Sequence, residues 1–91
     1  MSEIPDDVRA RLAREYPGET HFEAVRLVES LMCSARVLRS IVYLAAGDFE
    51  KLERFARASE IDWRDVVFWA EYEDHLAEEP RRVRSMEDPL S

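Results

Sequence analysis

The chain has 91 residues, 46% of them hydrophobic and 36% charged, which is typical of one soluble globular domain and excludes a disordered chain. Its formal net charge is −7, and the stretch from Asp62 to Glu79 contains seven acidic residues against one basic residue. Because this negative field repels phosphate backbones, we exclude nucleic acid as a partner.

The first predicted helix covers residues 5–16. Pro5 is tolerated in a first helical turn, and the two aspartates that follow it are favourable at the positive end of the helix dipole. Three apolar residues then recur every fourth position and predict a narrow buried stripe: Val8, Leu12 and Tyr16. The Pro-Gly pair at positions 17–18 ends this helix.

The longest predicted element is a single helix over residues 20–46. Thr20 and Glu23 match a capping box at its start, and Gly47 is suited to the left-handed position after its end. Apolar residues cover most of its circumference, including Phe22, Val28, Met32, Leu38 and Val42. Such a helix must be surrounded by other elements, and the charged residues Arg26, Glu29, Arg36 and Arg39 that interrupt it exclude a membrane span. We expect Cys33, which lies within it, to be a buried and inert thiol.

Two further helices are predicted after a tight joint at Gly47 and Asp48. The first covers residues 49–58, and its glutamates at positions 50 and 53 are spaced to pair with Arg54 and Arg57. The second begins after an N-cap at Asp62 and covers residues 63–78. Residues 80–91 have no periodicity, and their arginines either neutralise the acidic end of the last helix or form a basic docking peptide.

These elements predict an all-α fold, a small bundle of about four helices around the long helix at 20–46. Residues 1–79 form the predicted single domain, and residues 80–91 form an irregular C-terminal tail. The single cysteine excludes an internal disulfide, and the polar, acidic N-terminus does not resemble a secretory leader. Both features predict a cytoplasmic protein.

The last predicted helix carries more apolar side chains than one buried face needs. Phe68 and Tyr72 point away from its core side, and Trp69 borders that side. The acidic rim around these aromatic residues consists of Asp65, Glu71, Glu73 and Asp74. Aromatic residues are typical interface anchors, and the acidic rim favours a basic partner. The sequence therefore predicts a protein-interaction or regulatory module that forms a homodimer through this helix, unless the first helix or the tail covers Phe68 and Tyr72.

A second interpretation is a protein that binds a small molecule or a metal. Arg36, Arg39 and Tyr43 form a polar lane on the central helix, opposite the carboxylates of the last helix. Guanidinium groups on so apolar a helix need buried partners, and a ligand or internal ion pairs with Glu71 or Asp74 would both supply them.

Catalytic and cofactor motifs are missing from the sequence. Two glycines in the whole chain leave no phosphate-binding loop, and the two histidines form no nucleophile–base pattern. Glu71 and His75 are spaced like metal ligands, but a dinuclear bundle site needs a matching pair on a second helix. We therefore predict a non-enzymatic protein with no cofactor, metal, nucleic-acid or membrane partner.

Overall fold

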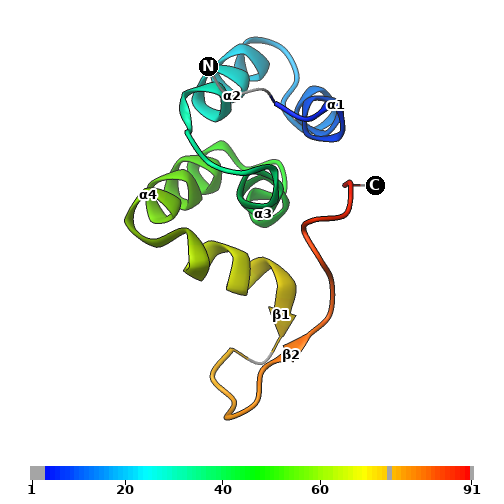
Figure 1. The fold of residues 1–91 in the computed structure, drawn as a ribbon. Helices are drawn as coiled ribbons and strands as arrows, with labels where there is room; N and C mark the ends of the chain where they lie inside the picture. The colour runs from blue at the N-terminus through cyan, green and yellow to red at the C-terminus, as the bar shows by residue number, and fades with distance from the viewer. Residues whose placement is uncertain (1–3, 74, 91) are drawn as a thin grey trace.

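The computed structural model describes residues 4–73 and 75–90, and within these it contains four helices and one small sheet (Figure 1). The elements in chain order are α1 (Asp6–Glu15), α2 (Glu19–Ser30), α3 (Ala35–Ala45), α4 (Phe49–Glu71), β1 (Tyr72–Glu73) and β2 (Arg81–Arg82). The two strands pair antiparallel. The predicted all-α bundle of four helices is confirmed.

Helix α1 forms as its sequence pattern predicts. It begins after Pro5, and its stripe of Val8, Leu12 and Tyr16 is fully buried. The phenol of Tyr16 donates a long hydrogen bond of 3.5 Å to the carbonyl of Asp48, which joins the end of α1 to the start of α4.

The prediction of one continuous helix over 20–46 is wrong. The chain leaves helical geometry at residues 31–34, where Leu31 is extended, and α3 restarts with the Ser34 hydroxyl accepting from Val37 N at 3.4 Å. The predicted capping box is also wrong, because α2 starts at Glu19 with no side-chain cap. The break explains the apolar circumference, since α2 and α3 each turn a different stripe toward the core.

Helix α3 is the most deeply buried element, and the hairpin that follows it forms as predicted. Ala46 and Gly47 both have positive φ, and the Asp48 side chain accepts from Lys51 N at 3.2 Å to cap α4. The core side chains of α3 include Leu38, Ile41, Val42 and Ala45. By contrast, Phe22 and Met32, which were predicted to widen the apolar face of one long helix, are exposed.

Helix α4 combines the two predicted helices into two arms that meet at a bend. Asp62 is non-helical at this bend, and its carboxylate accepts from Arg64 N at 3.1 Å, so it caps the second arm as predicted. The bend brings Trp69 of the second arm edge-on to Phe55 of the first, with 6.1 Å between ring centres. The second arm ends at Glu71, before the predicted end at Glu78, because the chain continues as β1 and pairs with β2.

Beyond β2 the tail returns along the bundle past α3 toward α1, as the orange-to-red trace in Figure 1 shows. Val83 N donates to the carbonyl of Glu71 at 2.8 Å, Met86 is buried, and Leu90 packs against the core. In the described part of the chain, no helix is long and apolar enough to cross a membrane.

Candidate functional site

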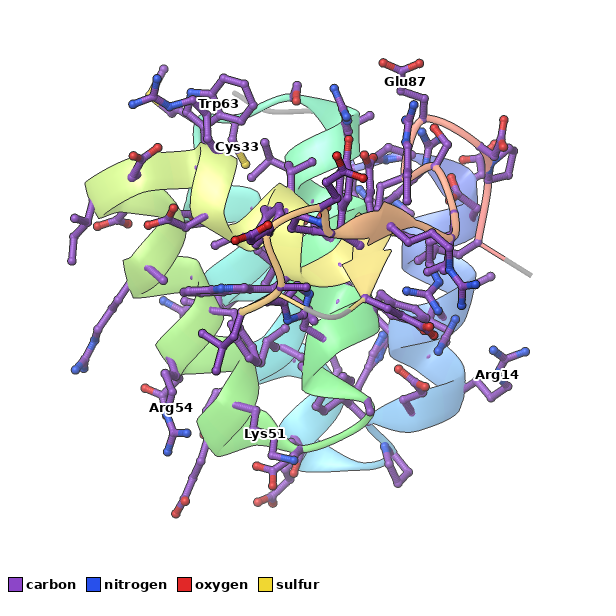
Figure 2. The ribbon with its side chains drawn as sticks, turned by 90° about the horizontal axis from the view of Figure 1, so that it is seen from below. Arg14, Cys33, Lys51, Arg54, Trp63 and Glu87 are labelled. Carbon is purple, nitrogen blue, oxygen red and sulfur yellow. The ribbon has the colours of Figure 1, made fainter. Side chains whose placement is uncertain are left out.

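A groove of about 560 Å³ lies between the connection at residues 31–34 and the bend of α4. Its lining consists of two serines together with Leu31, Met32, Cys33, Val37, Glu60 and Trp63. Leu31 and Val37 are buried, whereas Met32 is 93% exposed and Trp63 is 49% exposed. Figure 2 shows Trp63 beside Cys33 at this end of α4. The groove therefore combines buried apolar side chains with exposed ones at its edge.

The groove has little polar chemistry to offer. Glu60 is the one charged residue of its lining, and it forms no ion pair with any residue that the structure describes. Burial raises the pKa of the Cys33 thiol, which keeps it protonated and weakly nucleophilic. An apolar groove with one carboxylate is suited to apolar side chains accompanied by a positive charge.

The outer side of the same bend carries another exposed apolar side chain, Ile61, which is 87% exposed. It shares a shallow depression with Arg54 and Arg57 of the first arm of α4. Neither the predicted pair of Glu50 with Arg54 nor that of Glu53 with Arg57 is among the ion pairs of the described residues. Figure 2 shows Arg54 projecting away from the ribbon.

The sequence-predicted aromatic residues lie on the second arm of α4 and at its end. Phe68 is half-buried because its ring contacts those of Tyr72 and His75, with centres 5.2 and 5.0 Å away. Trp69 is 38% exposed. Asp65 and Glu73 are exposed beside them, and Glu73 pairs with Arg81 at 3.3 Å; Asp74 lies outside the described residues.

Glu71, which was predicted on the polar rim, is instead fully buried. Arg36 donates to both carboxylate oxygens, from Nε to Oε2 at 2.9 Å and from Nη2 to Oε1 at 2.7 Å. The carboxylate also accepts from Met86 N at 2.9 Å and faces Arg82 at 3.3 Å. Burial by itself raises the pKa of Glu71, but these donors and charges outweigh it and lower the pKa below the ordinary 4.5.

Arg39 pairs with α1, which the sequence did not indicate. Its Nε donates to Asp7 Oδ2 at 2.8 Å, and its Nη1 donates to the carbonyl of Glu87 at 3.0 Å. Asp7 Oδ2 also accepts from Leu90 N at 2.9 Å. The hydrogen bonds from Arg39 lower the pKa of Asp7, and the Leu90 N–H adds to this against the effect of burial. Internal ion pairs with Glu71 or Asp74 were one of the two predicted ways to satisfy Arg36 and Arg39. The pairing with Glu71 is present for Arg36, whereas Arg39 pairs with Asp7 of α1 instead.

The predicted ligand lane does not converge on one cavity. The Tyr43 ring lies under the guanidinium of Arg84, 4.8 Å from ring centre to Cζ, while Arg36 and Arg39 are held by Glu71 and Asp7. The two ion pairs join α3 to α4 and α1. The tail is attached to the same three helices by Arg84 over Tyr43, by Met86 N on Glu71 and by Leu90 N on Asp7. Within the described residues, no cluster of three or more His, Cys, Asp or Glu is placed to hold a metal ion.

Sequence reasoning missed the groove because it placed Met32 and Cys33 inside one continuous helix. The available signal was Ser34, three residues before Val37, which is the spacing of an N-cap inside the predicted helix. No family model matches the chain, and neither the curated proteins nor the solved structures contain a match.

Proposed function

We propose that this protein is a small, non-enzymatic interaction module that binds another polypeptide through the groove at the bend of α4. The observation that carries this proposal is that Met32, almost fully exposed, and Trp63, half exposed, lie at the edge of a groove. The same groove is lined by buried Leu31 and Val37. Methionine and aromatic residues are enriched at the centres of protein interfaces.

The aromatic residues of α4 are a second candidate surface for the same function. Asp65, Phe68, Trp69 and Tyr72 share the side of the second arm that faces away from buried Val66 and Ala70. With Glu73 they form an aromatic patch with an acidic edge, suited to a basic partner or to a second copy. The groove is the stronger candidate, because Met32 at its edge is 93% exposed, whereas Phe68 and Tyr72 are half-buried against each other and Trp69 is 38% exposed.

Binding of a small molecule or a metal through Arg36, Arg39 and Tyr43 has less support. Both guanidinium groups already have carboxylate partners, Glu71 and Asp7. One oxygen of each carboxylate also accepts from a backbone N–H of the tail. These contacts account for the two arginines without a ligand.

The groove proposal can be tested by photo-cross-linking in a lysate of source cells. Benzoylphenylalanine replaces Met32 in one variant and Leu76, a fully exposed apolar residue of the β1–β2 turn, in the control. We expect the Met32 position to yield discrete polypeptide adducts that the Leu76 position does not yield. Identical adduct patterns, or no adduct from either position, would contradict the proposal.

A further inference from the structure

We infer that Met32 is an oxidation site that controls the groove: a peroxide converts its thioether to a sulfoxide, and the sulfoxide weakens the binding of the partner polypeptide. This inference rests on the proposed role of the groove as a binding surface. It adds a reversible covalent modification that changes the affinity of that surface.

The first support is the contrast between the two methionines that the structure describes. Met32 lies in the connection at residues 31–34 and is 93% exposed, whereas Met86 is 4% exposed. A peroxide must contact the sulfur atom, and at Met32 it can do so in the folded protein. Oxidation of Met86 requires the tail to open first, so Met32 should react before it.

The reaction is a two-electron oxygen transfer that needs no cofactor. The Met32 sulfur donates an electron pair to one oxygen of hydrogen peroxide, the O–O bond breaks, and an S–O bond forms. The departing hydroxide takes the proton from the transferred oxygen and leaves as water. The thioether is thereby oxidised to a sulfoxide while the peroxide is reduced, and methionine sulfoxide reductases reverse the change.

The second support is the low reactivity of the neighbouring thiol. Cys33 also lines the groove, but it is half-buried, and burial raises the pKa of its thiol. Peroxides react with the thiolate rather than with the protonated thiol. The charged residue of the lining, Glu60, is negative and therefore does not stabilise a thiolate. Met32 is thus the sulfur of the groove that peroxide should oxidise first.

The third support is the place of Met32 in the proposed interface. Its side chain lies at the groove edge with Trp63, where a bound partner covers it. The two serine hydroxyls of the lining already bond backbone groups, Val37 N and the Ala56 carbonyl. A sulfoxide oxygen buried against this apolar lining therefore adds a desolvation cost to binding. Because Met32 is almost fully exposed in the free protein, the same oxidation leaves the core intact.

Peptide mapping by mass spectrometry, after timed treatment with hydrogen peroxide, tests the site. We expect the sulfoxide to form at least about tenfold faster at Met32 than at Met86 in the folded protein, and at similar rates in urea. Oxidation at Met32 should change Tm by no more than about 3 °C, as is usual for a change at an exposed side chain. Equal rates in the folded protein, or a larger fall in Tm on Met32 oxidation, would overturn the inference.

Photo-cross-linking in the lysate tests the effect on binding. Benzoylphenylalanine replaces Trp63, with exposed Glu60 of the lining as a second reporter position, and Cys33→Ala removes the competing thiol. Catalase removes the peroxide before the lysate is added. We expect oxidation to reduce the polypeptide adducts about fivefold or more, and methionine sulfoxide reductases to restore them.

Two substitutions at the same position are the matched controls. Met32→Leu keeps an apolar side chain without sulfur, so its adducts should persist after peroxide. Met32→Gln places a polar oxygen near the position of the sulfoxide, so its adducts should be weak before any treatment.

Failure of this inference is distinguishable from failure of the proposed function. Adducts that peroxide does not reduce, or that fall equally in Met32→Leu, overturn the oxidation inference and leave the groove as a binding site. No adducts above the Leu76 control from any groove position before oxidation overturns both.

Discussion

Replacing Glu71 with glutamine removes the negative charge of a fully buried carboxylate. The carboxylate binds Arg36 through two hydrogen bonds, accepts from Met86 N, and faces Arg82. Glutamine keeps the shape and one acceptor oxygen, but its amide group places N–H donors against the donors of Arg36. The change therefore weakens both the contact between α3 and α4 and the attachment of the tail.

The expected loss follows from the burial of the two partners. Breaking a fully buried ion pair by removing one partner costs about 3–5 kcal/mol. The Arg36 side chain is one-third exposed, so water can solvate its charge after the substitution. One acceptor oxygen also remains. We therefore expect Glu71→Gln to lower the free energy of unfolding by about 2–3 kcal/mol, which corresponds to roughly 10–20 °C in Tm for a domain of this size.

Urea unfolding followed by circular dichroism at pH 7 measures this loss. The assay is run on Glu71→Gln, Arg36→Met and the double variant, for which we expect a coupling energy of about 1–3 kcal/mol. Asp62→Asn with Arg64→Met is the control cycle, because that ion pair is exposed and asparagine retains the helix cap. The control should show no measurable coupling.

Two results would refute this reasoning. Additive losses in the Arg36–Glu71 cycle would mean that the side chains do not interact in solution. A loss for Glu71→Gln no larger than that for Asp62→Asn would mean that Glu71 is solvated rather than buried.

Three other measurements test the packing and the titration of buried groups. Because the pKa values of Asp7 and Glu71 are lowered, both carboxylates stabilise the fold fully above their ordinary pKa values of 3.8 and 4.5, and this stabilisation is lost as the pH falls through their folded-state pKa values. The urea midpoint of wild type should therefore fall below pH 4.5. The midpoint of Glu71→Gln should fall by a smaller amount. Burial is the main cause that raises the pKa of Tyr16 to about 12, and the charge of the neighbouring Glu15 adds to it. About 2–3 kcal/mol of the free energy of unfolding should therefore be lost as the pH rises from about 10 to 12, and Tyr16→Phe should reduce this loss. Leu38→Ala should cost about 2–5 kcal/mol in urea unfolding, because Leu38 is fully buried in α3, and a silent substitution would contradict its place in the core.

Elements with local signals were predicted well. The structure contains the two aspartates and the three-residue apolar stripe of α1, the positive-φ joint before Asp48, and the cap at Asp62. Each depends on hydrogen bonds or side-chain spacing within one or two helical turns, so the residues that decide it are near one another in the sequence.

The break at residues 31–34 could not be read from periodicity. A run that is apolar on most sides fits either one surrounded helix or two shorter helices with different buried faces. Packing of α2 and α3 against their neighbours decides between them, and the Ser34 cap stabilises the second arrangement. The groove depends on this break, because Met32 and Cys33 line it from the connection.

By itself the sequence determined the helical class, the ends of α1, the α3–α4 joint and the bend at Asp62, because local hydrogen bonds and apolar spacing specify them. Tertiary structure alone decided that Arg39 pairs with Asp7, that Glu71 is buried, and that the tail crosses the bundle. These contacts join residues far apart in the sequence. Whether a charged side chain is solvated or paired depends on which other element packs against it, and residue spacing along one helix does not indicate which element that is.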